Sequence, residues 1–208
     1  MAPRTLILLG GATASGKTTT AAALARQLGA AWLKVDMLWR VIREALPPGS
    51  DRELLSLDDH HRLRTLPAAE LRDQHLAASR FICDRLPVAL QMELTYHEAV
   101  VADGAWLLPE FVASLGLEAL GFPGARKASV FIHEPEAIEV KHAMRNRRGT
   151  PVTASWQRGG AAAWALHGDW LAAEARRVGI PVVAARPRET LITRAATALG
   201  IAPPDSIV

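Results

Sequence analysis

Near its N-terminus the chain carries the segment Thr5-Leu-Ile-Leu-Leu-Gly-Gly-Ala-Thr-Ala-Ser-Gly-Lys-Thr18, which is the strongest indication of its fold. The first five residues of this segment form a run without helical spacing that ends at glycines, which predicts a parallel strand buried on both faces. Residues 11–18 then place two glycines with four residues between them, followed by a lysine and a hydroxyl residue. After the loop, apolar residues recur at helical spacing, which predicts a helix that ends at a capping Gly29. These residues are Ala21, Leu24, Ala25 and Leu28. Strand, glycine-rich loop and helix follow one another in the order that a phosphate-binding loop requires.

Such a loop has a physical basis for holding a nucleotide. Its glycines let the backbone wrap around phosphates, and successive amides at a helix N-terminus supply partial positive charge. Lys17 can reach the terminal phosphates, and Thr18 can place its hydroxyl on magnesium. We therefore expect ATP and Mg²⁺ as cofactors, with the nucleotide held by Gly11, Ala14, Ser15, Gly16, Lys17, Thr18 and Thr19. A glycine-rich turn with an exposed lysine is the alternative, which the flanking strand and helix disfavour.

The rest of the chain alternates strands and helices. Further strands are predicted at residues 31–35, 100–102, 128–132 and 180–184. Helical patterns are predicted at 37–46, at 68–86, from Pro87, from near Pro135, and around 191–199. Residues 47–67 are polar and carry turn formers, and the basic stretch 147–160 is typical of a functional lid or a disordered loop. This alternation predicts an α/β fold: a five-stranded parallel sheet with helices on both faces.

Composition narrows the class of protein. With 208 residues, half of them hydrophobic, the chain is long enough for one domain with one core. Its 24 basic and 21 acidic residues are interspersed, so we expect no nucleic acid partner. The first apolar run is too short for a signal peptide or a membrane span, and the lone Cys83 predicts a buried thiol. We expect a cytoplasmic protein without a membrane partner, and the sequence leaves both a monomer and a homodimer open.

Two acidic residues follow predicted strands, at the edge where ligands collect in parallel sheets. Asp36 could accept the proton of an attacking hydroxyl as a general base, with Arg40 and Arg43 on the next turn holding an anionic acceptor. Alternatively, Asp36 caps the helix and pairs with Arg40. Asp103 is placed to orient magnesium together with Thr18, and a simple turn aspartate before a glycine is its alternative.

A basic run at Arg145, Arg147 and Arg148 lies where a helix enters the irregular stretch. Arginines on a closing lid can stabilise the charge of a transferred phosphoryl group while water is excluded. A solvated helix end explains the same run equally well.

These residues together resemble the nucleoside monophosphate kinase-like group of P-loop small-molecule kinases, which includes adenylate, shikimate, gluconate and chloramphenicol kinases. The resemblance rests on residues 11–18 and on four further segments, namely Val35-Asp-Met-Leu-Trp-Arg40, Val101-Ala-Asp-Gly-Ala-Trp-Leu-Leu-Pro109, Arg145-Asn-Arg-Arg-Gly149 and Ala185-Arg-Pro187. The segment around Asp103 also resembles 2-phosphoglycerate kinase-like proteins. The resemblance implies a P-loop NTPase three-layer sandwich with a lid.

The resemblance also implies roles. It implies transfer of the ATP terminal phosphoryl group to a hydroxyl of a small-molecule acceptor, with Lys17, Asp36, Arg145 and Arg148 as catalytic residues. It places Arg186 and Pro187 beside the adenine, an acceptor-binding helical region at 37–97 and a lid at 145–165. A nucleotide-dependent switch that hydrolyses ATP or GTP for a protein partner is the alternative from another class. An antibiotic-resistance or toxin kinase would differ only in its acceptor.

Overall fold

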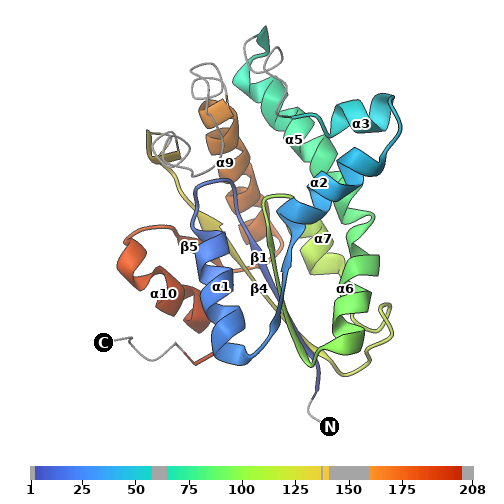
Figure 1. The fold of residues 1–208 in the computed structure, drawn as a ribbon. Helices are drawn as coiled ribbons and strands as arrows, with labels where there is room; N and C mark the ends of the chain where they lie inside the picture. The colour runs from blue at the N-terminus through green and yellow to red at the C-terminus, as the bar shows by residue number, and fades with distance from the viewer. Residues whose placement is uncertain (1–2, 58–64, 137, 141–159, 203–208) are drawn as a thin grey trace.

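A five-stranded parallel sheet forms the centre of the molecule (Figure 1). The computed structural model describes residues 3–57, 65–136, 138–140 and 160–202. The strands lie in the order β2-β3-β1-β4-β5, with every neighbouring pair parallel. Their bounds are β1 Thr5–Gly10, β2 Ala31–Lys34, β3 Ala99–Gly104, β4 Arg126–His133 and β5 Val182–Ala184. The predicted α/β class and the five strands are confirmed.

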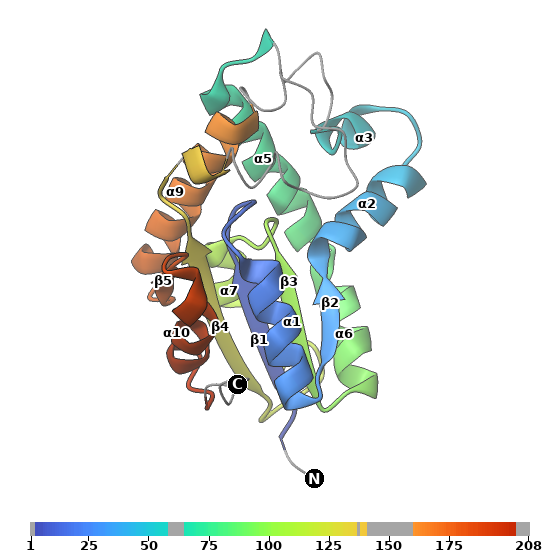
Figure 2. The ribbon, with the colours of Figure 1, turned by 60° about the vertical axis from the view of Figure 1, so that its left-hand side comes forward.

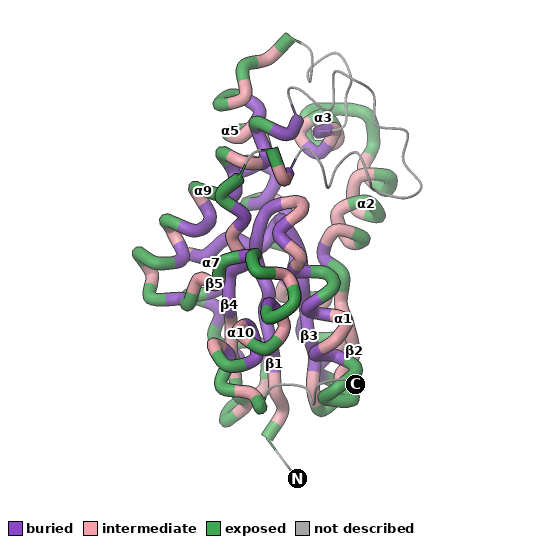
Figure 3. The backbone as a smooth tube through the Cα atoms, turned by 90° about the vertical axis from the view of Figure 1, so that its left-hand side faces the viewer, coloured by how far each residue is buried: buried purple, intermediate pink, exposed green. Residues whose placement is uncertain are grey.

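Helices cover both faces of the sheet and complete the three layers (Figure 2). One face carries α1 (Lys17–Leu28) and α10 (Leu191–Ala198), which pack on Ile7 and Leu9. The opposite face, where Leu6 and Leu8 point, carries α5 (Ala68–Cys83), α6 (Leu86–Tyr96), α7 (Pro109–Ser114) and α9 (Ala161–Arg177). Alternate residues of one strand therefore enter two cores, as the pleat of a β-strand dictates. Figure 3 shows the buried central strands β1 and β3 inside partly exposed helices, whereas the edge strands β2 and β5 have no fully buried residue.

Two short helices extend past the carboxyl ends of the strands. They are α2 (Val35–Ala45) and α3 (Ser50–Leu54), and Figures 1 and 2 show both beyond the sheet, with α3 beside α5. The loop that follows β1 opens at this same end. The arrangement puts the predicted phosphate loop at the same end of the molecule as α2 and α3, and the role of residues 37–97 as an acceptor-binding region stays a prediction.

Several boundaries differ from the prediction. The strand expected to end at Asp36 ends at Lys34, because α2 already begins at Val35 and takes Asp36 into its first turn, where a negative charge is favourable. Helix α3 lies within the polar stretch expected to be a loop. Helices α7 and α9 were not predicted, and α9 includes the last five residues of the predicted lid range. After Pro135 the described residues show helix at 138–140.

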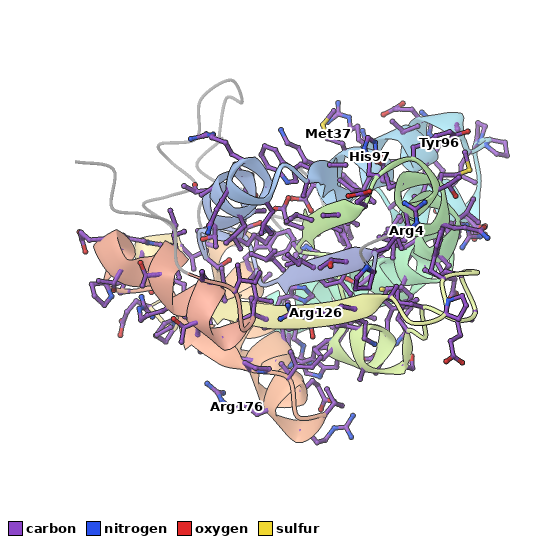
Figure 4. The ribbon with its side chains drawn as sticks, turned by 90° about the horizontal axis from the view of Figure 1, so that it is seen from below. Arg4, Met37, Tyr96, His97, Arg126 and Arg176 are labelled. Carbon is purple, nitrogen blue, oxygen red and sulfur yellow. The ribbon has the colours of Figure 1, made fainter. Side chains whose placement is uncertain are left out.

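The opposite end of the sheet is closed by arginine contacts to backbone carbonyls. Arg4 donates to the carbonyl of His97 at 2.9 Å, and Arg126 donates to the carbonyls of Leu199 and Gly200 at 3.0 and 3.1 Å. Figure 4 shows Arg4, His97 and Arg126 in the view of this end. Among the helices of the described residues, none is long and apolar enough to cross a membrane.

Candidate active site

The loop between β1 and α1 has the backbone shape that a phosphate cradle needs. Gly11 and Gly16 have φ angles of 141° and 93°, which side chains rarely tolerate. A Cβ atom at Gly16 would also lie 2.5 Å from Nη1 of Arg188. Helix α1 begins at Lys17 with no side-chain cap, so its first amides are not occupied by a capping side chain. These amides are the groups that bind an anion.

Two buried polar groups of this loop fit a phosphate ligand. The side chain of Lys17 is 5% exposed, and its Nζ atom lies 3.5 Å from the carbonyl oxygen of Ala12. Among the described residues, no acidic side chain forms an ion pair with it. The Oγ atom of Ser15 is buried and has no hydrogen-bond partner in the described part of the chain. A phosphate oxygen would supply both the missing counter-charge and the missing partner.

Thr18 and Asp103, both predicted to act on magnesium, lie together. The Thr18 hydroxyl donates to Oδ2 of Asp103 at 2.8 Å, although the two residues are 85 positions apart in the chain. Strand β3 pairs with β1, which aligns Asp103 with Leu9 just before the loop. The second oxygen, Oδ1, accepts a hydrogen bond of 2.8 Å from the indole of Trp32 on β2. This fixes both oxygens of a carboxylate that is only 2% exposed.

Asp36 lies beside the loop that leaves β3. Its Oδ1 atom accepts a hydrogen bond of 3.1 Å from the backbone N–H of Ala105, so the carboxylate is tied to a backbone two residues from Asp103. The alternative partner Arg40 instead contacts Glu44, at 4.0 Å. Arg43 also contacts Glu44, at 2.8 Å, and lies over the ring of Trp39. The structure therefore places Asp36 at the site, whereas the two arginines predicted to hold an anionic acceptor meet Glu44.

Arg188 is a site residue that the sequence did not reveal. Its guanidinium donates to the carbonyl oxygens of Ser15 and Ala14 at 2.6 and 2.7 Å, and to Oε2 of Glu134 at 3.0 Å. Ala14 has a φ of 74°, so this contact supports the most strained part of the loop. Arg186, predicted beside the adenine, pairs with Glu134 and with Glu139. No sequence motif marked Arg188, because its contact depends on a loop more than 170 residues away.

An aromatic cluster adjoins Asp36 and the end of β3. We define it as Trp39 of α2, His75 of α5, Trp106 after β3, and Trp164 and His167 of α9. Trp39 stacks on Trp106 at 5.2 Å between ring centroids, and His75 stacks on Trp164 at 4.2 Å. Burial lowers the pKa of His75 to about 3 and that of His167 to about 4, so both rings are neutral at neutral pH. Five residues from four segments could not be grouped by spacing alone.

The predicted lid arginines Arg145, Arg147 and Arg148 lie outside the described residues. Their roles, and that of the range 145–165 as a lid, stay predictions. The predicted adenine contacts of Arg186 and Pro187 stay predictions as well.

Comparison with known proteins gave structural neighbours only. No protein-family model and no curated protein matches the chain. A shikimate kinase from Acinetobacter baumannii in complex with shikimate is 15% identical, with 87% of this chain and 82% of that chain covered and a TM-score of 0.48. A gluconokinase from Sinorhizobium meliloti is 18% identical, with 95% and 92% covered and a TM-score of 0.46. A shikimate kinase from Bacteroides thetaiotaomicron is 15% identical, with 96% and 100% covered and a TM-score of 0.47.

Proposed function

We propose that the protein is an ATP-dependent phosphotransferase that moves the terminal phosphoryl group to a hydroxyl of a small-molecule acceptor. The observation that carries this proposal is the 2.8 Å bond between Thr18 and Asp103 beside the buried Lys17. A glycine-rich turn without function would have no need of a buried lysine that lacks an acidic partner among the described residues, or of a carboxylate bonded to the hydroxyl of Thr18. The second carboxylate, Asp36, adds a proton acceptor within the same loop region.

The proposed chemistry is an in-line displacement. The acceptor oxygen forms a bond to the terminal phosphorus, and the bond from that phosphorus to the bridging oxygen breaks. ADP leaves with the electron pair, and the hydroxyl proton moves to the free oxygen of Asp36. Lys17 and the loop amides stabilise the charge that spreads over the phosphoryl oxygens. Arg188 holds the loop in shape during this step, because it bonds two of the loop carbonyls.

Thr18 and Asp103 are the residues that would hold magnesium. A hydroxyl and a carboxylate are oxygen ligands, and magnesium commonly adds waters and substrate phosphates to one or two such groups. Bound there, the ion would neutralise charge on the phosphates. Among the described residues, no cluster of three acidic, histidine or cysteine side chains offers another metal site.

Replacing Asp103 with asparagine is expected to weaken magnesium binding by about tenfold or more, because one carboxylate charge is lost beside Thr18. The magnesium concentration that gives half-maximal binding of ATP, followed by calorimetry, measures the effect. Trp32→Phe is the matched control: it removes the other hydrogen bond to Asp103 and keeps the charge, so a smaller change is expected. An unchanged magnesium requirement in Asp103→Asn would contradict the metal assignment.

The experiment that tests the function is ATP consumption with magnesium against hydroxylated metabolites, nucleosides, nucleotides and antibiotics, with products identified by mass. An acceptor that gains one phosphoryl group is the expected result. ATP hydrolysis that no acceptor stimulates, together with a stable protein complex, would favour the nucleotide-dependent switch instead.

A further inference from the structure

The aromatic cluster contains an unusual number of unpaired polar atoms. Four ring nitrogens of the cluster are buried and have no hydrogen-bond partner among the described residues, namely Nε1 of Trp39 and Trp106 and Nδ1 of His75 and His167. Trp106, His75 and His167 are 4%, 2% and 0% exposed. Leaving a buried polar atom unpaired is costly, and most such atoms in folded proteins find partners. Four of them in one cluster indicate a ligand that supplies the partners.

The cluster lies directly against the predicted phosphoryl-transfer site. Trp106 follows Ala105, whose N–H donates to Asp36 and whose carbonyl lies 3.2 Å from Nε2 of His167. Gly168, the residue after His167, packs closely against the phosphate loop. A Cβ atom added to it would lie 3.2 Å from the Cβ of Ala12. A molecule bound at the cluster would therefore lie within reach of both Asp36 and the nucleotide.

The unpaired atoms specify what the ligand must offer. Both indole nitrogens are donors, so they require acceptor atoms on the ligand. Nε2 of His167 faces a carbonyl oxygen, which only accepts, so this nitrogen carries the proton of the neutral ring. Its Nδ1 atom is then an acceptor, and it requires a donor on the ligand other than the reacting hydroxyl, such as an amide N–H. The stacked rings around these atoms favour a flat apolar body.

Charge at the cluster argues against an anionic acceptor. None of its five side chains carries a charge at neutral pH, since both histidines are buried and neutral. Besides burial, the positive charges of Lys17 and Arg72 contribute to the lowered pKa of His167, and Arg72 pairs with Asp73 at 2.7 Å. Arg43 lies over Trp39 but bonds Glu44. Within the part of the chain that the structure describes, a buried carboxylate of the ligand would lack a dedicated counter-charge, so burying it would be costly.

We infer that the aromatic cluster binds the acceptor, and that this acceptor is an uncharged aromatic alcohol with hydrogen-bond acceptor groups on its ring. The inference rests on the proposed function, because it names the substrate class of the same site. The ring would pack on the tryptophans, and its ring substituents would accept from the indoles. Its hydroxyl would attack the terminal phosphorus while Asp36 takes the proton and ADP leaves, as described above.

A matched pair of probes tests the substrate class. We would measure binding of para-(hydroxymethyl)benzamide and of the equally sized anion para-(hydroxymethyl)benzoate by calorimetry, with gluconate as a non-aromatic anion. The benzamide is expected to bind about tenfold or more tightly than the benzoate. Equal or stronger binding of the benzoate or of gluconate overturns the inference, and so does absence of binding of the benzamide.

Variants test the residues. Trp106→Phe keeps a ring and removes one unpaired N–H, so benzamide binding should fall by about 5–10-fold while the Tm of the free protein rises by about 2–4 °C. A purely structural tryptophan would show no loss of binding. Trp39→Phe provides a second variant should Trp106→Phe fail to fold. Trp170→Phe, on α9 but without a ring contact to the cluster in the described residues, is the control, with unchanged binding expected.

Different experimental outcomes contradict the proposed function and the inference about the aromatic cluster. Selective binding of the benzamide without phosphoryl transfer from ATP would uphold the inference about the cluster and contradict the proposed function. Transfer from ATP to gluconate but not to the benzamide would uphold the function and overturn the inference.

Discussion

Replacing Lys17 with alanine is expected to lower the rate of phosphoryl transfer on the order of 10²–10³-fold. The side chain is buried and faces a carbonyl oxygen, so its charge is held for the nucleotide phosphates and no acidic side chain of the described residues competes for it. Transfer from ATP to the acceptor found in the panel assay measures the rate, and calorimetry measures ATP binding.

The same variant should not lose stability, because it removes a buried charge that no acidic side chain of the described residues balances. A Tm equal to or above that of the parent protein would show that lost activity is not lost folding. Arg26→Ala is the matched control, since it removes a positive charge from the exposed last turn of the same helix. Normal activity in Lys17→Ala would contradict the assignment of residues 11–18 as a phosphate cradle.

Replacing Asp36 with asparagine is expected to lower transfer on the order of 10²–10⁴-fold while ATP binding stays nearly unchanged. The amide oxygen can still accept the N–H of Ala105, so the local structure is kept, but the side chain no longer accepts a proton. Single-turnover transfer to the same acceptor separates this chemical step from binding.

A second substitution at Asp36 distinguishes catalysis from anchoring. Asp36→Ala removes both the base and the hydrogen bond to Ala105. If Asp36→Asn stays active and only Asp36→Ala is impaired, then the carboxylate anchors the loop and is not the base. Asp51→Asn on the exposed helix α3 serves as the control, with no change expected.

The fold could be predicted because its signals are local. A buried strand, a glycine-rich loop and a helix adjoin one another in the first 29 residues, and each later strand is a short apolar run. The errors lie where two local preferences compete. At Val35 and Asp36 the strand pattern continues in the sequence, but the helix begins there and its N-terminal dipole favours an acidic residue in the first turn. In α3 a five-residue helix is too short to leave a periodic pattern.

The meeting of two candidate site residues could be predicted only where their positions at strand ends bring them together. Thr18 and Asp103 meet because β1 and β3 are neighbouring parallel strands whose carboxyl ends share an edge. Arg188 and the aromatic cluster depend on tertiary packing of distant segments, and the tryptophans taken singly are more often ordinary core residues. The expected anionic acceptor relied on Arg40 and Arg43, whose charges meet Glu44 on their own helix.

The positions of the tryptophans have one practical consequence. Trp32 donates to the carboxylate of Asp103, whereas Trp106 stacks in the cluster beside Asp36. Indole emission depends on the hydrogen bond and polarity around each ring, so the unlabelled protein carries one optical reporter at the predicted metal position and others at the predicted acceptor position. Comparison of the Trp32→Phe and Trp106→Phe variants with the parent protein separates the two fluorescence signals. The order in which the ligands bind can then be measured by fluorescence.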